Sequence, residues 1–363
     1  MINLRSLSPR FRFDPLAHGL PPREVLDARR HRPPLPAYRL KEAQAIAAAA
    51  RQDGDWQPAA AYVAAAGDDW DDRWRRAEFL QAVARDEDGW ADAWVDAWCQ
   101  AQPEDCDAAT LHASLMVHKA WRIRGSGYAH QVPYARMAQF RALLPASIEA
   151  ARRAAQLAPE NPGPWVVMVT AARGARYSPD DFQPLWAELT ARAPHHYEAH
   201  WQALQFWCAK WAGSDSLMLR FAEQAVDCAP EGSPLAAMYL HALQELKERH
   251  GSVRLTRGRK ALLARTAASL ATVPADDERM PPVRHLLAYH LGRAGLHDAA
   301  LDQFRLIGPY CGAEPWNGGG DPAKVFDQAR ARSARWARNP YPGPDGPTAT
   351  RRADVRRVPD THW

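Results

Sequence analysis

The sequence predicts an all-α protein, an α-solenoid of about seven helical hairpins closed by a C-terminal capping helix. Three prolines, Pro159, Pro194 and Pro230, recur at intervals of about 35 residues, which is typical of stacked helical hairpins. Hydrophobic residues make up 47% of the 363-residue chain, enough to fill the core of such a stack. The 30 Pro and 21 Gly fall mostly between helical stretches and in two tails.

The composition divides the chain into three parts. Residues 1–39 carry eight Arg against three acidic residues, together with several Pro, and are predicted to form a basic, extended N-terminal arm. Helical periodicity begins at Leu40, so residues 40–338 are predicted to form the repeat domain. Residues 339–363 begin with a Pro-rich and Gly-rich run that cannot continue a helix, and this tail is predicted to be disordered.

Within the repeat domain the apolar periodicity and the turn residues define the helix pairs. The pairs are predicted at residues 40–66, 71–101, 107–158, 162–193, 196–229, 233–272 and 281–307. A last helix is predicted from Pro322 to Arg338, because Asp321 is a suitable N-cap and proline is tolerated at the first helical position. The preceding Gly318-Gly319-Gly320 is interpreted as a linker. This helix would cover the apolar face of the final hairpin.

Two segments near the ends of the repeat domain share one spacing of small and large residues. They contain Gly54, Ala59, Val63 and Ala66 in one case, and Gly295, Ala300, Phe304 and Ile307 in the other. The second segment follows a helix and a Gly turn, and it closely resembles the tetratricopeptide (TPR) repeat. The resemblance implies small residues where the two helices of a hairpin cross. Ser147, Ala151 and Ala154 follow a looser form of the pattern, so the hairpins are described as TPR-like.

A second resemblance concerns the segment from Gln205 to Trp211, followed by Leu217 to Glu223. This segment, together with the high Ala, Arg and Trp content, resembles a group of uncharacterised actinobacterial proteins with TPR-like helices. That resemblance implies no catalytic residue. It therefore supports the fold and leaves the function open.

Charge and cysteine content exclude several classes of protein. The formal net charge is only +4, so nucleic-acid binding would depend on the basic arm rather than on the whole surface. The five Cys are scattered and include no C-x-x-C pair, which indicates neither a disulfide framework nor a zinc site. No stretch is apolar for long enough to predict a signal peptide or a transmembrane helix. We expect a soluble cytoplasmic protein without a cofactor.

Fifteen Trp is a large number for a chain of this length, and Trp90, Trp94 and Trp98 lie four residues apart on one helix face. Helical spacing favours packing between neighbouring helices. The alternative is a stacking platform for sugars, bases or Pro-rich peptides.

The segment Asp68-Asp69-Trp70-Asp71-Asp72 contains a D-D-x-x-D motif. It is similar to the Asp-rich segment of class I terpene synthases, and this resemblance implies magnesium held by Asp68, Asp69 and Asp72. The second metal motif of that family has no match here, since the nearest segment, Ser214 to Glu223, lacks its Asn and its spacing. Acidic residues would also favour the start of a helix, which is the simpler interpretation.

Four residues, His195, His196, Glu198 and His200, cluster at a predicted helix start. Two imidazoles one turn apart can share a metal ion, but the order differs from that of zinc proteases. A solvated or helix-capping role is the simpler interpretation.

The leading functional hypothesis is a non-enzymatic scaffold that binds a peptide or partner protein on the concave face of the solenoid, as the TPR resemblance implies. Trp207, Lys210, Trp211 and Arg220 are the candidate partner-binding residues, because they lie on the segments expected to line that groove. The alternative is a magnesium-dependent, terpene-synthase-like enzyme that uses the Asp-rich motif. A third hypothesis is nucleic-acid binding through residues 1–39.

Overall fold

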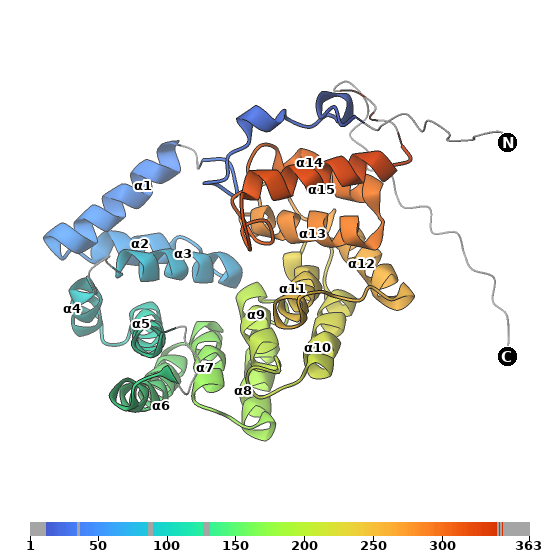
Figure 1. Cartoon of the computed structure of the whole chain (residues 1–363). Helices are drawn as coiled ribbons and strands as arrows, with labels where there is room; N and C mark the ends of the chain where they lie inside the picture. Colours follow the sequence, from blue (N-terminus) through green and yellow to red (C-terminus); the bar gives the residue numbers. More distant parts are fainter. Residues whose placement is uncertain are drawn as a thin grey trace, which may run out of the picture. The chain divides into compact units, whose positions relative to one another are not determined.

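The computed structural model describes residues 12–34, 37–85, 90–125, 131–339, 341 and 343. Over this part of the chain it is all-helical, with 15 α-helices and no strand, which confirms the predicted all-α class (Figure 1). The chain forms two compact units. Unit 1 comprises residues 1–33 and 231–363, and unit 2 comprises residues 34–230. Most of the predicted C-terminal tail, 339–363, lies outside the described residues.

Unit 2 contains five helix pairs in the predicted order. Its helices are α1 (Ala37–Ala48), α2 (Gln57–Ala64), α3 (Trp70–Val83), α4 (Ala93–Ala101), α5 (Cys106–Arg124), α6 (Tyr134–Leu157), α7 (Gly163–Gly174), α8 (Pro179–Arg192), α9 (Tyr197–Phe206) and α10 (Asp215–Cys228). The first helices of consecutive pairs pack against one another, because α5 contacts both α3 and α7, and α7 also contacts α9. Each pair therefore buries one helix against the next pair.

Helix α7 is largely buried in the core of unit 2. Pro164 lies in its first turn, where the missing backbone N–H costs nothing. Val166 to Val169 follow without a polar residue, and each is at most 1% exposed. In α6, which packs on α7, the small residues Ser147, Ala151 and Ala154 are fully buried, as the predicted helix crossing requires. The core of unit 2 thus follows the pattern of small and apolar residues in the sequence.

Trp94 and Trp98 lie in α4 and confirm the packing interpretation, whereas Trp90 precedes that helix and forms an isolated bridge with Arg85, so the prediction that all three share one helix face is wrong. Trp94 and Trp98 are 2% and 1% exposed, and Trp56 stacks on Trp98 with 6.0 Å between ring centres. Trp90 is partly buried, and the Lys119 ammonium lies 5.3 Å from its ring centre. Packing between helices accounts for Trp94 and Trp98.

Unit 1 contains the last two predicted pairs and the predicted terminal helix. Its helices are α11 (Met238–His250), α12 (Arg257–Leu270), α13 (Met280–Ala294), α14 (His297–Ile307) and α15 (Pro322–Trp336). Gly295 ends α13 in the left-handed conformation at φ 81°, and Asp321 caps α15 by accepting from the backbone of Ala323. Helix α13 packs against α11, α14 and α15. Among the described residues, no helix is both long and apolar enough to cross a membrane.

Residues 12–33, here called the N-terminal segment, belong to unit 1. The sequence predicts a separate basic arm over residues 1–39, but residues 12–33 of that arm lie along α14 and α15, and residues 37–39 begin α1 (Figure 1). Asp27 forms a parallel bridge with Tyr310, and Leu20 is 2% exposed. The composition of the arm could not reveal this packing, because the contacts join residues almost 300 positions apart.

Candidate functional site

The structure places the four predicted partner-binding residues in unit 2, in different surroundings. Trp207, Lys210 and Trp211 lie in the turn between α9 and α10, and Arg220 is exposed on α10. Trp207 packs edge-on against Phe182 and Phe206 and belongs to the core of unit 2. Lys210 is exposed, whereas Trp211 is partly buried among side chains from other helices.

The turn between α9 and α10 fixes the position of Trp211. The backbone N–H of Trp211 donates to Cys208 at 2.9 Å, and Ser214 N–H donates to Trp207 at 3.1 Å. The chain closes so tightly here that a Cβ at Gly213 would lie 1.9 Å from the Trp207 carbonyl oxygen. Only glycine fits this approach of backbone to backbone, so the turn holds Trp211 in one place.

Trp211 meets residues from three helices in a group that we call the Trp/Arg cluster. Its members are Trp121 and Arg124 of α5, Phe140 of α6, Arg173 of α7, and Trp211. The Trp121 and Trp211 rings meet edge-on, with 5.3 Å between their centres. The guanidinium carbon of Arg124 lies 5.6 and 5.7 Å from these two ring centres, and that of Arg173 lies 4.9 and 5.3 Å away. Two cations thus share two indole rings.

The Trp/Arg cluster has hydrogen-bond donors that lack acceptors. The indole nitrogens of Trp121 and Trp211 are buried, and neither finds a hydrogen-bond partner among the described residues. A buried donor without an acceptor costs about 1–3 kcal/mol, so such groups need a reason. All four Trp and Arg side chains remain partly exposed, so the cluster is accessible from solvent. The cluster therefore combines two guanidinium cations with two indole N–H donors.

Sequence reasoning found one member of the Trp/Arg cluster and missed the others. Trp121 and Arg124 are three residues apart just before Gly125, and Arg173 directly precedes Gly174 at the end of α7. The signal for these residues in the sequence is an aromatic or basic residue at the end of the first helix of a pair. A Cβ at Gly174 would lie 2.6 Å from Leu144 and 3.0 Å from Trp121, so this glycine allows α7 to approach the cluster.

The Asp-rich motif serves the start of α3. Asp69 caps the helix by accepting from the backbone of Asp72 at 2.9 Å. Both carboxylate oxygens of Asp72 are engaged, one with Arg75 and one with Arg76, each at 2.8 Å. No group of three His, Cys, Asp or Glu within the described ranges could hold a metal ion, so the magnesium hypothesis gains no support from this geometry.

The histidine group combines capping and burial. His196 caps α9 with Nδ1, which accepts from the Ala199 backbone at 3.2 Å, and His195 is exposed. His200 is buried, its Nδ1–H donates to the His196 carbonyl at 2.9 Å, and burial lowers its pKa to about 4. The capping and solvated roles hold for His196 and His195. The burial of His200 was not anticipated.

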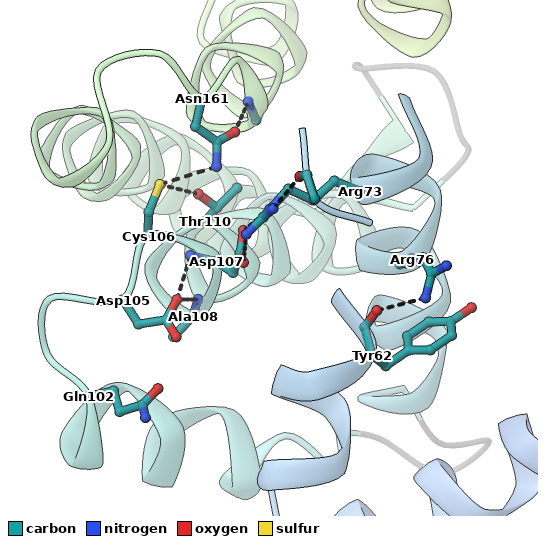
Figure 2. Close-up of polar contacts among 12 residues, drawn as sticks. Tyr62, Arg73, Arg76, Gln102, Asp105, Cys106, Asp107, Ala108, Thr110 and Asn161 are labelled. Carbon is teal, nitrogen blue, oxygen red and sulfur yellow. Dashed lines mark hydrogen bonds and ion pairs between the residues drawn. The ribbon is translucent and has the colours of Figure 1, made fainter. Parts of the chain in front are cut away.

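Figure 2 shows a polar junction that joins α3, α5 and the turn before α7. Arg73 forms two parallel hydrogen bonds to Asp107, at 2.9 and 2.7 Å, and Asn161 donates to the Cys106 sulfur at 3.5 Å. Burial raises the pKa of the Cys106 thiol to about 11, so the nucleophilic thiolate is scarce at neutral pH. The adjoining cavity has a volume of about 20 Å³, room for about one water molecule. This junction is suited to holding helices together.

Comparisons of the chain with protein-family models, curated proteins and solved structures gave no match.

Proposed function

We propose that this chain is a non-enzymatic binding protein, built from TPR-like helical hairpins, that binds an acidic peptide segment at the Trp/Arg cluster. The observation that carries the proposal is the pair of buried indole N–H groups of Trp121 and Trp211 beside Arg124 and Arg173. A carboxylate accepts from both guanidinium and indole donors, so one acidic side chain could satisfy the two indole N–H groups beside the arginines.

The fold supports a binding role for this position. The first helices of consecutive pairs, α5, α7 and α9, pack side by side. The Trp/Arg cluster takes residues from the end of α5, from the end of α7 and from the turn after α9. In repeat proteins a row of equivalent helix ends forms an extended surface suited to a chain segment. Lys210 is exposed in the same turn as Trp211 and adds positive charge.

The experiment is a fluorescence anisotropy titration of the full-length protein with two labelled pools of short peptides, one Glu-rich and one Lys-rich. We expect the Glu-rich pool to bind and the Lys-rich pool not to bind. Binding should weaken as NaCl rises from about 50 to about 500 mM, because salt screens charge pairs at a partly exposed site.

Variants assign the binding to the cluster. Arg124→Gln and Arg173→Gln should each weaken binding by about tenfold, the worth of one charged hydrogen bond. The matched control is Arg192→Gln: Arg192 also lies over an indole, 4.8 Å from the Trp165 ring centre, but it pairs with Glu188. Equal binding of the Glu-rich pool by all three variants and the unchanged protein would refute the proposal.

A further inference from the structure

The N-terminal segment is held on unit 1 almost entirely through its main chain. Arg305 of α14 donates to the His18 carbonyl at 2.9 Å, and Arg330 of α15 donates to the Pro21 carbonyl at 2.8 Å. His285 of α13 donates through Nε2 to the His31 carbonyl at 3.0 Å. One side chain from each of three helices thus donates a hydrogen bond to a backbone carbonyl of the segment.

Backbone pairing adds a second set of contacts. Asp27 N–H donates to the Pro309 carbonyl at 2.8 Å, and Cys311 N–H donates to the Asp27 carbonyl at 2.9 Å. Gly312 N–H donates to the Arg30 carbonyl at 2.8 Å. A Cβ at Gly312 would lie 2.5 Å from the Ala28 carbonyl oxygen, so glycine allows the two chains to approach. Main-chain hydrogen bonds are one of the recurring ways in which proteins bind peptides.

The side chains of the segment divide into anchors and outward-facing groups. Leu20 is 2% exposed, and the adjacent Gly19 adopts φ 67° beneath the Tyr341 ring. Arg23, Arg29 and Arg30 are exposed. Phe13 is half-buried, with its ring centre 5.9 Å from the Arg330 guanidinium carbon. A segment that presents a few apolar side chains and otherwise its backbone meets the surface as a peptide ligand does.

The receiving surface is preorganised by unit 1 itself. Arg330 is fully buried and is oriented by Asp327, at 2.5 Å, and by the Phe326 ring beneath it. The Nδ1 atom of His285 accepts from the Trp316 indole at 2.8 Å, which leaves Nε2 protonated for the His31 carbonyl. Because these donors are held by residues of unit 1, the site does not depend on the segment for its geometry.

We propose that α13, α14, α15 and residues 309–312 form a peptide-binding site for a Leu-Pro-containing segment, and that residues 12–33, which include the short 3-10 helices Leu16–His18 and Arg23–Val25, occupy it as an exchangeable intramolecular ligand. This site is separate from the Trp/Arg cluster and does not rest on the function proposed for it. In the intact chain the site is filled. A competing peptide of the same pattern would displace the segment.

The test uses the full-length chain with a protease recognition sequence inserted between Pro34 and Ala37. After cleavage, a labelled synthetic peptide of residues 12–33 is added in excess, and anisotropy, gel filtration and circular dichroism are recorded. We expect the labelled peptide to bind, the cleaved segment to be released and the helical signal to remain. The uncut protein should bind the labelled peptide more weakly than the cleaved protein, because the tethered segment competes at a high effective concentration.

Variants of the synthetic peptide keep the test independent of protein folding. A Leu20→Asp peptide should compete about ten to one hundred times more weakly, since it loses the burial of one leucine. An Arg29→Gln peptide should compete like the original, because Arg29 is exposed. Failure of the cleaved segment to exchange, or its release with loss of the helical signal, would show that it is a fixed part of the fold and would overturn the proposal.

Discussion

Arg73 and Asp107 show how one ion pair can join elements of unit 2. The pair is bidentate, and its side chains are 23% and 15% exposed. The hydrogen bonds that Arg73 donates to Asp107 raise the pKa of Arg73 further above its ordinary value. Because the two charged groups are paired and partly shielded from water, removing one charge leaves the other without an opposite charge beside it.

We therefore predict that Asp107→Asn lowers the free energy of unfolding by about 1–3 kcal/mol. Urea unfolding followed by circular dichroism measures the change. The control is Arg153→Gln, which removes a surface pair with Glu149 whose arginine side chain is 72% exposed, and it should change stability by less than about 0.5 kcal/mol. Equal effects of the two substitutions would contradict the role given to the polar junction.

At the scale of single elements, the turn between α9 and α10 decides whether the Trp/Arg cluster forms. Gly213→Ala would place a Cβ against backbone that cannot move aside, so we predict a loss of about 2 kcal/mol or more in unfolding free energy. The environment of Trp211 should change with it, which near-ultraviolet circular dichroism detects.

Gly258→Ala is the control, since Gly258 lies in α12 with open space around it. That substitution should leave stability unchanged or raise it by up to about 1 kcal/mol. An intact near-ultraviolet spectrum in Gly213→Ala would count against this account of the turn.

The helices themselves could be predicted from the sequence because their ends depend on local signals. Asp321 and Pro322 start α15 and Gly295 ends α13, as predicted, and α1 begins at Ala37 rather than at Leu40. Proline and glycine act through the dihedral angles of single residues, so their effect is visible in a short window.

The long-range contacts could not be predicted in the same way. Trp121 and Trp211 are 90 positions apart, and Arg330 bonds to a carbonyl at Pro21. No local pattern records which helix ends meet. The Arg-rich composition of residues 1–39 predicts a basic, extended arm, because the many arginines dominate the composition. The contacts that fix the segment are instead made mainly by its backbone and by Leu20, which composition does not reveal.

At the scale of the whole molecule, buried histidines in both units couple stability to pH. Burial lowers the pKa of His118, His200 and His285 to about 4, and that of His290 to about 3, from an ordinary value of 6.5. In the unfolded chain these groups take up protons at a higher pH than in the fold. The stability that they contribute is therefore present above about pH 6.5 and is lost as the pH falls towards 4.

We predict that the free energy of unfolding decreases between about pH 6.5 and pH 4, as measured by urea unfolding at several pH values. His285→Gln should reduce the slope over this range by up to about 1.4 kcal/mol per pH unit. His195→Gln, at an exposed position, should leave the slope unchanged. A slope that is the same in His285→Gln as in the unchanged protein would contradict this assignment.

The binding proposal for the molecule is tested most directly by the NMR signals of its tryptophan indole N–H groups during titration with a Glu-rich peptide. Signals of Trp121 and Trp211 are assigned by substituting each residue with Phe, and Trp165 serves as an internal reference because its buried indole nitrogen also lacks a partner among the described residues. We predict downfield shifts of the Trp121 and Trp211 signals as a carboxylate accepts hydrogen bonds from their indole N–H groups, with Trp165 unmoved. Saturating peptide that shifts neither signal, or shifts all three equally, would contradict it.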